Sequence, residues 1–502
     1  MRTTPFAFLF LSLISLPSWG QVHYHDNGRP WSHKTRKGPD AEVGGWYYNL
    51  GITGLRAVLI KDKPANLLIK FVFKDTPAHG KIQAGDIITG ANGKTFETPH
   101  KNGYGVEVFG GDGPMKDFAI ALDKSQGDEI KGELTLDVVR GEQELKVNLN
   151  VGTKYGLYGK SFPVNCKKSD LILDELYEFV ASKQKEDGSW GAPQQNTFAP
   201  LALMASGDKK YLPLVKKNVQ LHAKKTKAKD YFSLMNWTYM AAGIVMSEYY
   251  LATQEEWVLP ELQEVYDFLI SSQYVDTSQI AEATRNNKKR NSPKDNKRAH
   301  GGWGHNPGYE GYGPICMTTG QGALAFALMS RCGIKVDRAR HDKAYNFLVR
   351  GTGRNGYVWY KDEVANHERW ADMGRTGASA LANFLSPYKD EKYNRRAMSH
   401  SKCIGDHPET LPDTHGSPIM GMGYTALAAH WDEASFRKMM DNNRWWFTLS
   451  QCTDGSFYYQ PNRDYNPYDF QNAPRVSASA VVALIFSAKN RNLHVTGAKK
   501  AQ

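Results

Sequence analysis

The fold is decided by a short stretch that follows an apolar segment. Residues 184–191 read Gln184-Lys185-Glu186-Asp187-Gly188-Ser189-Trp190-Gly191. Apolar residues recur at three- and four-residue intervals over 171–180, which indicates an amphipathic helix before this stretch. Asp-Gly-Ser is typical of a turn that needs a residue tolerant of positive φ. A second apolar segment begins at Thr197. The unit therefore predicts a helix, a Gly-Trp turn and a second helix.

Related stretches recur along the chain. A near-complete copy reads Gln451-Cys452-Thr453-Asp454-Gly455-Ser456-Phe457, ahead of a helix expected near Arg475. Two degenerate copies contain Gly301-Gly302-Trp303-Gly304 and Asn355-Gly356-Tyr357-Val358-Trp359. A repeated residue is best explained by repeated packing. We therefore expect Trp190 to be a structural wedge and not a ligand contact.

This repeat resembles that of the α/α toroids, the fold family that includes terpenoid cyclases and protein prenyltransferase subunits. The resemblance implies an (α/α)6 toroid over residues 169–492, built from six helix pairs. The inner helices are expected to begin near Thr197, Asn236, Met317, Arg375, Ser417 and Arg475. The outer helices are expected at 169–183, 209–225, 256–273, 336–350, 389–402 and 432–450. Small residues crowd the inner set, which would let these helices approach closely around the ring axis.

A segment of different character precedes the toroid. Residues 46–152 contain short β-branched runs separated by Gly turns, which predict strands. Within them, Gly85-Asp86 leads into a buried strand and Asn92-Gly93 closes a tight hairpin. This segment resembles a PDZ domain. The sequence thus predicts an α+β multidomain protein, with a small PDZ-like β domain followed by a large all-α toroid.

The PDZ resemblance also implies a binding site. Asn49-Leu50-Gly51-Ile52 resembles the carboxylate-binding loop of PDZ domains. A C-terminal or extended peptide would add as a strand, and amides near Leu50, Gly51 and Ile52 would hold its carboxylate. The alternative is that this domain docks on the toroid with its groove filled.

The first residues predict export. Residues 1–20 combine Arg2, an apolar run from Phe6 to Leu16 and small residues before Gln21, as in a secretory signal peptide. No later segment is long and apolar enough to span a membrane. A periplasmic or secreted protein is therefore expected. Its remaining parts are an extended leader at 21–45, a linker at 153–168 and a tail at 493–502. The domain order also resembles that of an uncharacterised family of exported bacterial proteins.

Charge and cysteine content narrow the possible partners. The formal net charge is +11, and residues 284–300 alone hold seven basic residues against one acidic residue. The basic stretch 274–300 is an insertion that is either a solvated loop or a clamp for an acidic polymer. Nucleic acid is not an expected partner, because the protein is exported and the stretch lacks interleaved aromatic residues. The five cysteines are widely spaced and odd in number, which predicts buried free thiols.

Candidate functional residues lie on the loops that lead into the inner helices, at the end of the toroid that we call the mouth. A carboxylate or a histidine can serve as general acid or base, and the catalytic candidates are Asp372, Asp413 and His415. Aromatic faces stack on ligands, and arginine forks fit oxyanions. The ligand-binding candidates are Arg375, Arg475, Trp303, Trp370, His305 and Tyr312. For each residue alone, packing or helix capping is the competing role.

Several chemistries of related toroids are disfavoured. Squalene-cyclase-type enzymes need a contiguous Asp-x-Asp-Asp acid, which does not occur in the sequence. The zinc ligand set of prenyltransferases is incomplete around Cys316, and the thioester motif Cys-Gly-Glu-Gln is absent. Neither a metal nor a cofactor is expected.

An anionic ligand is expected at the mouth. Six parallel inner helices gather their N-termini there, and each N-terminus presents unpaired N–H groups and about half a positive charge. Two function classes stay open. The first is an exported enzyme, such as a hydrolase or lyase on an acidic glycan. The second is a non-catalytic binding or scaffold protein that uses the PDZ-like groove and the toroid surface for protein partners.

Overall fold

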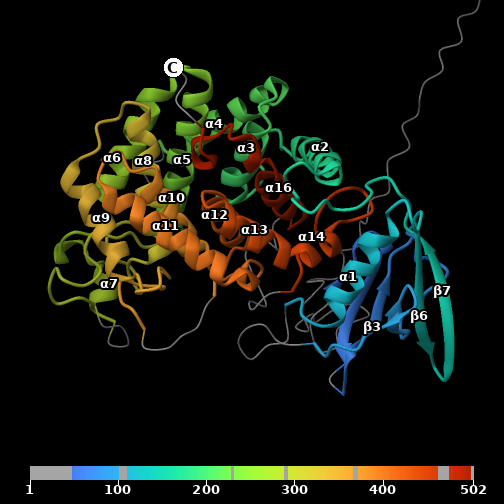
Figure 1. The fold of residues 1–502 in the computed structure, drawn as a ribbon. Coiled ribbons are helices and arrows are strands. Elements are labelled where there is room, and N and C mark those ends of the chain that lie inside the picture. Colours follow the sequence, from blue (N-terminus) through green and yellow to red (C-terminus); the bar gives the residue numbers. More distant parts are fainter. Residues whose placement is uncertain are drawn as a thin grey trace, which may run out of the picture.

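The computed structural model describes residues 48–60, 62–100, 110–227, 231–287, 292–365, 371–461 and 474–498. In this part of the chain, an antiparallel sheet stands beside a ring of helices (Figure 1). The expected signal peptide and leader lie outside the described residues, as does Trp370. Among the described helices, none combines the length and apolar character that a membrane crossing requires.

The sheet domain contains one antiparallel sheet and the helix α1 (Pro114–Ser125). The sheet order is β1-β2-β3-β4-β6-β7, with β5 paired to β4. Helix α1 packs on β3, β4 and β6, and its buried side chains include Phe118 and Leu122. The strands are β1 (Tyr48–Asn49), β2 (Leu55–Ile60), β3 (Lys63–Val72), β4 (Ile87–Ala91), β5 (Lys94–Thr95), β6 (Glu133–Arg140) and β7 (Gln143–Asn150).

Both turn signals of this domain have the expected conformations. The Asp86 side chain is buried, and its two oxygens accept hydrogen bonds from Nε and Nη2 of Arg140 at 2.8 and 2.7 Å. Asn92 and Gly93 have φ values of +51° and +74°, as a tight hairpin between β4 and β5 requires.

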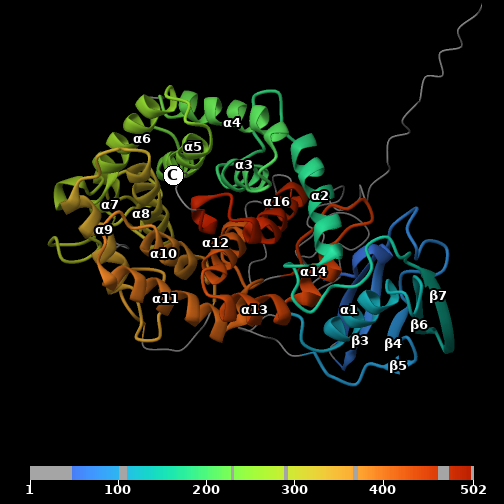
Figure 2. The ribbon, with the colours of Figure 1, turned by 45° about the horizontal axis from the view of Figure 1, so that its top comes forward.

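The inner helices form a closed ring (Figure 2). Each packs against the next along the chain, and the last packs against the first. They are α3 (Gln195–Ala205), α5 (Met235–Thr253), α8 (Cys316–Arg331), α10 (Gly374–Phe384), α12 (Pro418–His430) and α16 (Pro474–Ser487). Every one begins within two residues of the predicted start. The described helices therefore confirm the predicted toroid.

The outer helices surround this ring and run back between the inner ones. They are α2 (Lys167–Ser182), α4 (Leu212–Lys225), α6 (Val258–Ser272), α9 (Arg338–Arg350), α11 (Glu391–Asp406), α13 (Glu433–Asn442) and α14 (Arg444–Ser450). The helix predicted at 432–450 is thus interrupted at Asn443. Short helices in the connections are η2 (Gly51–Thr53), η3 (Lys209–Tyr211), η4 (Thr277–Gln279), α7 (Glu282–Arg285), η5 (Pro408–Thr410), η6 (Ala488–Asn490) and η7 (His494–Thr496).

Small residues bring the inner helices together. A Cβ added to Gly320 of α8 would lie 2.9 Å from the Cβ of Ala378 on α10. A Cβ added to Gly377 of α10 would lie 2.2 Å from the carbonyl oxygen of Tyr424 on α12. Larger side chains at these two positions would force the helices apart, so the small residues are required by the closed ring.

Two of the Gly-Trp turns join α2 to α3 and α6 to α8. Trp190 and Trp303 are 1% and 0% exposed. Their indole N–H groups donate to the carbonyls of Val180 (2.7 Å) and Leu269 (2.9 Å), which lie in the last turns of α2 and α6. Each of these carbonyls also accepts a backbone N–H, that of Lys183 at 3.2 Å for α2 and that of Gln273 at 3.1 Å for α6. Each tryptophan therefore fills volume and adds a second hydrogen bond at the end of the helix that precedes it.

The chain's last described segment closes the other end of the ring. The Glu248 carboxylate on α5 accepts hydrogen bonds from the N–H groups of His494 and Val495 at 3.0 and 2.8 Å. Trp431 donates from Nε1 to the carbonyl of Val495 at 3.1 Å. Burial raises the pKa of Glu248 to about 7. The described part of the expected tail, 493–498, is thus packed against the ring. It lies at the end of the ring opposite the mouth.

All five cysteines are buried and free. Burial raises the pKa of the Cys316 thiol above its usual range and that of the Cys332 thiol to about 12. These thiols are therefore protonated at neutral pH and behave as small apolar side chains.

Candidate functional site

A row of aromatic and imidazole rings crosses the mouth, and we call it the mouth row. Its members are Trp237, His305, Tyr312, Tyr360 and His415. Trp237 and His305 are stacked with ring centroids 5.6 Å apart, and the edge of Tyr312 meets His305 at 5.2 Å. The hydroxyls of Tyr360 and Tyr312 are 3.2 Å apart, and Tyr360 meets His415 at 5.8 Å. The row thus links the start of α5 to three separate mouth loops.

Hydrogen bonds fix the protonation state of His305. The indole N–H of Trp237 lies 2.7 Å from Nδ1 of His305. An indole N–H can only donate, so Nδ1 must accept and the ring hydrogen must sit on Nε2. Nε2 bonds to the hydroxyl of Tyr312. Burial lowers the pKa of His305, and the ring is therefore neutral and held on both sides.

An acid–arginine cluster lies next to the row. Arg375, in the first turn of α10, donates from Nη1 to Asp372 at 3.1 Å, from Nη2 to the hydroxyl of Tyr357 at 2.9 Å and from Nε to the carbonyl of Val358 at 3.2 Å. The guanidinium carbon also lies 5.7 Å from the ring centroid of Tyr360. The row and the cluster therefore meet at Tyr360.

The second candidate acid joins this cluster from a different loop. The N–H of Asp372 donates to the carbonyl of Asp413 at 2.8 Å, and the two residues are 2% and 1% exposed. Asp372 has a left-handed φ of +49°, a conformation that is uncommon outside glycine and gathers at functional sites. A Cβ added to Gly421 of α12 would lie 2.5 Å from Thr414 and 3.3 Å from Asp372. This glycine lets the two loops approach.

The structure therefore brings together the residues that the sequence nominated for catalysis. Asp372 and Asp413 are adjacent, and His415 lies two residues further on, exposed and beside Tyr360. Among the ligand-binding candidates, His305 and Tyr312 belong to the mouth row, and Arg375 belongs to the acid cluster. No group of three His, Cys, Asp or Glu side chains suited to a metal ion was found among the described residues.

Two other ligand-binding candidates lie elsewhere. Trp303 is fully buried in its turn, a position that suits packing and offers no face to a ligand. Arg475 reaches back from α16 to the turn that precedes it, where it pairs with Asp454 and donates from Nε to the hydroxyl of Ser456 at 3.0 Å. It packs over the ring of Phe179 on α2. Arg475 and Arg375 thus both bind acceptors within the protein. Anion binding by these arginines stays a prediction, and the structure does not favour it.

The proposed peptide loop is covered. Leu50, Gly51 and Ile52 are buried, and the N–H of Leu50 donates to the carbonyl of Leu55 at 2.9 Å. A Cβ added to Gly51 would lie 2.8 Å from the carbonyl oxygen of Thr448 on α14. A free peptide could reach these amides only if α14 moved away. Peptide binding stays a prediction, and the alternative of a filled groove fits this geometry better.

Sequence reasoning missed two members of the mouth row. Trp237 lies in the first turn of α5 and Tyr360 directly follows the turn at 355–359. A usable signal existed in both cases, because the first turn of every inner helix and the residues after every turn lie at the same end of the ring. What the sequence lacked was the rotation of each helix, which decides whether such a side chain points to the mouth or into a neighbour.

These features define an α/α toroid with a docked sheet domain and a mouth that carries aromatic and acidic side chains. Residues 169–497 match the model of the family described as "Domain of unknown function (DUF6288)", and the chain belongs to that family. No curated protein gave a significant match.

Solved structures with a similar course of the chain share little sequence with it. An inactive variant of the α-1,6-mannanase GH76A of Salegentibacter sp. HEL1_6, in complex with α-1,6-mannotriose, has 12% identity and a TM-score of 0.48, covering 64% of this chain and 98% of that chain. A GH76 α-mannanase of Bacteroides thetaiotaomicron has 14% identity and a TM-score of 0.42, covering 63% and 94%. The cellobiose 2-epimerase of Bacillus thermoamylovorans B4167 has 12% identity and a TM-score of 0.40, covering 64% and 98%. All three TM-scores lie below 0.5, and we draw no conclusion about activity from them.

Proposed function

We propose that the mouth of the ring binds a glycan and that the protein is an exported hydrolase or lyase acting on an acidic glycan. The observation that carries this proposal is the contact at Tyr360 between the mouth row and Arg375, which is paired with the buried Asp372. A row of half-buried aromatic rings offers faces on which sugar rings stack, and its hydroxyl and imidazole groups can bond to sugar hydroxyls.

The two acids suit glycosidic bond hydrolysis. Most glycoside hydrolases use a pair of carboxyl groups, one as the general acid and the other as base or nucleophile. Asp372 is ion-paired with Arg375 and therefore suits the role that needs a carboxylate. Asp413, on the neighbouring loop, is then the candidate for the acid. A lyase would instead remove a proton next to a sugar carboxylate, and the exposed His415 suits that base.

A charged ligand is favoured by two features of the mouth. The parallel inner helices direct their N-termini, with their partial positive charges, to this end of the ring. Lys361 is exposed and its ammonium lies 5.9 Å from the ring centroid of Tyr312. An acidic sugar on the mouth row would therefore find a cation within reach.

Calorimetric titration with sulfated, carboxylated and neutral oligosaccharides tests the binding. We expect Tyr360→Ala to weaken binding of an acidic oligosaccharide by about tenfold or more, equivalent to about 1.4 kcal/mol. Tyr388→Ala is the control, because Tyr388 is a partly buried tyrosine packed against His341 of α9, outside the mouth row. Equal affinities for neutral and acidic ligands would remove the acidic substrate, and failure of every sugar to bind would remove the glycan site.

Product analysis tests the chemistry. Asp413→Asn is expected to lower hydrolysis by about 10²-fold or more while it leaves binding in place. If the enzyme is a lyase, His415→Ala gives the larger loss and the product contains an unsaturated sugar.

A non-catalytic binding protein is the second candidate. It is favoured by His305, because both ring nitrogens of this imidazole are already bonded to Trp237 and Tyr312 and neither is available for acid–base chemistry. Binding of glycans without any turnover would support this candidate. Export rests on residues 1–20 alone, and the mass of the mature N-terminus would test it.

A further inference from the structure

The strand edge that would accept a peptide is already paired within the chain. Strand β1 pairs with β2 in antiparallel register, with Tyr48 opposite Ala57 and Asn49 opposite Arg56. Strand addition needs a free row of main-chain N–H and C=O groups. At these two positions of β2, that row is used by the residues that directly precede the carboxylate-binding loop. The Tyr48 hydroxyl also donates to the carbonyl of Gly110, next to α1, at 3.1 Å.

Helix α14 of the ring covers the loop itself. It packs against both η2 and α1 of the sheet domain, and the views of Figures 1 and 2 both show it beside α1. Gly51 lies between the two helices, because a Cβ there would be 2.8 Å from Thr448 of α14 and 2.8 Å from Leu122 of α1. The buried ring of Trp445 on α14 lies against Gly111, where a Cβ would be 2.1 Å away. The ring helix thus fills the space over the loop.

The side chain of Gln460 completes the contact in the manner of a neighbouring strand. Its Oε1 accepts from the N–H of Asn49 at 3.1 Å, and its Nε2 donates to the carbonyl of the same residue at 3.1 Å. The Asn49 side chain donates in turn to the carbonyl of Tyr459 at 3.1 Å. Both Asn49 and Gln460 are buried. Breaking these bonds without replacement would leave buried polar groups unsatisfied, which is costly.

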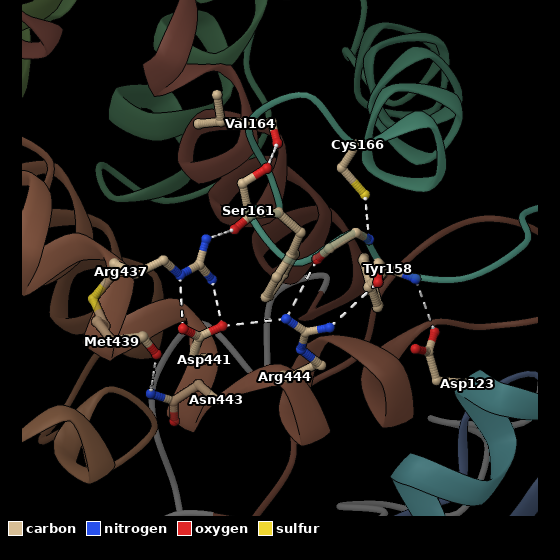
Figure 3. A network of polar contacts seen from close by, with 12 residues as sticks. Asp123, Tyr158, Ser161, Val164, Cys166, Arg437, Met439, Asp441, Asn443 and Arg444 are labelled. Carbon is tan, nitrogen blue, oxygen red and sulfur yellow. Dashed lines mark hydrogen bonds and ion pairs between the residues drawn. The ribbon is translucent and has the colours of Figure 1, made fainter.

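A second set of contacts also holds the sheet domain. The buried ammonium of Lys168 at the start of α2 pairs with Asp123 of α1 at 2.7 Å. Arg444 of α14 donates to the carbonyls of Tyr158 and Gly159 in the linker, and Asp441 holds the same guanidinium (Figure 3). The two domains are therefore joined through the linker as well as through the loop, which keeps the sheet domain in one orientation.

We infer that the peptide-binding surface of the sheet domain is an intramolecular docking site whose occupant is the ring's own α14 together with Gln460. The domain then acts as a brace for the segment 458–460, which precedes α16 in the chain. A peptide with a free C-terminal carboxylate binds this surface only after that contact is broken. This inference does not depend on the glycan ligand, and its test involves no sugar.

The test uses the full chain and two measurements. The first is fluorescence anisotropy with a library of peptides that end in a free carboxylate, each compared with its C-terminally amidated twin. The second is amide hydrogen exchange over residues 50–55. The variants are Gln460→Ala, which removes the strand-like pairing, and Trp445→Ala, which removes the wedge against Gly111. Gln263→Ala is the matched control, because Gln263 is an exposed glutamine on α6.

The expected result is that the wild type and Gln263→Ala bind no peptide in a carboxylate-dependent way. In Gln460→Ala, exchange over residues 50–55 is expected to become about tenfold faster or more, and a carboxylate-dependent peptide signal is expected to emerge. Since Trp445→Ala can also destabilise α14, the milder Gln460→Ala decides the outcome. The inference fails if the wild type already binds free-carboxylate peptides as tightly as Gln460→Ala does. It also fails if exchange over 50–55 is the same in the wild type and both variants.

Discussion

The turns that follow α2 and α6 close the repeat differently from the turns that follow α9 and α14. In the first pair, Trp190 and Trp303 fill the turn and cap the preceding helix with an indole N–H. In the second pair, an arginine from the following inner helix reaches back into the turn, Arg375 in one case and Arg475 in the other. The first solution is neutral and fully buried, whereas the second carries a charge that must be paired.

The backbone of the four turns is nevertheless the same. Gly188, Gly301, Gly356 and Gly455 have φ values between +82° and +93°. At the first three of these glycines, a Cβ would lie 2.2 to 2.7 Å from a carbonyl oxygen of the next outer helix. Glycine is therefore required by both the conformation and the close approach. The repeat fixes the path of the chain but does not fix which side chain fills the turn. One of the two arginines, Arg375, lies beside the candidate acid Asp372.

The largest expected effect comes from removing a tryptophan wedge. Trp190→Ala and Trp303→Ala should each lower the free energy of unfolding by about 3–5 kcal/mol, because each leaves a buried cavity and removes one hydrogen bond at a helix end. Chemical denaturation of the purified variants measures this. Trp359→Ala, at a turn that an arginine closes, is the control and should cost less, because Trp359 is only partly buried. An unchanged melting temperature in Trp303→Ala, together with altered glycan binding, would mean that this tryptophan contacts a ligand after all.

Breaking one of the arginine–aspartate ion pairs should have the next largest effect on stability. Arg375→Met removes the partner of Asp372 in a fully buried pair and should cost about 3 kcal/mol, because a lone carboxylate is left in the interior. The double variant Arg375→Met/Asp372→Asn should recover part of this loss. Arg475→Met should cost less, because the side chains of Arg475 and Asp454 are each 17% exposed and water can solvate what remains. If Arg375→Met and Arg475→Met lower the free energy of unfolding equally, the difference in burial between the two ion pairs does not determine how much each contributes to stability.

The smallest expected effect concerns pH. The carbonyl of Gly188 accepts from the amide of Asn218, whereas that of Gly356 is held by Nδ1 of His400 at 2.7 Å. Burial lowers the pKa of His400 from 6.5 to about 4. In the unfolded chain His400 is therefore protonated below pH 6.5, whereas in the folded chain it is protonated only below about pH 4. The contribution of His400 to the free energy of unfolding is complete above pH 6.5 and decreases as the pH falls, by about 2 kcal/mol at pH 5.

Urea unfolding at pH 7 and pH 5 checks this prediction. We expect His400→Gln to lose less stability than the wild type between the two pH values. His79→Gln, at an exposed histidine of the sheet domain, should follow the wild type. A His400→Gln variant with the same pH dependence as the wild type would show that this turn is not a source of acid sensitivity.

The sequence by itself predicted the ring because its signals are local and repeated. Apolar spacing fixes the helices, Asp-Gly turns fix where they end, and small residues mark the inner set, so the inner helices begin within two residues of the expected positions. The Gly-Asp and Asn-Gly turns of the sheet were equally readable, because their φ requirements restrict the residues that can stand there.

Other features depended on contacts between residues far apart in the sequence. Arg375 and Arg475 were both expected to face the mouth. In the structure, each guanidinium points back into the turn that precedes its own helix, because carbonyl and carboxylate acceptors lie there. Helix rotation and domain docking likewise decide three further features: the adjacency of Asp372 and Asp413, the mouth row, and the covering of Leu50–Ile52 by α14. Helix rotation and domain docking leave no periodic pattern in the sequence, because both are set by which side chains meet once the ring has closed.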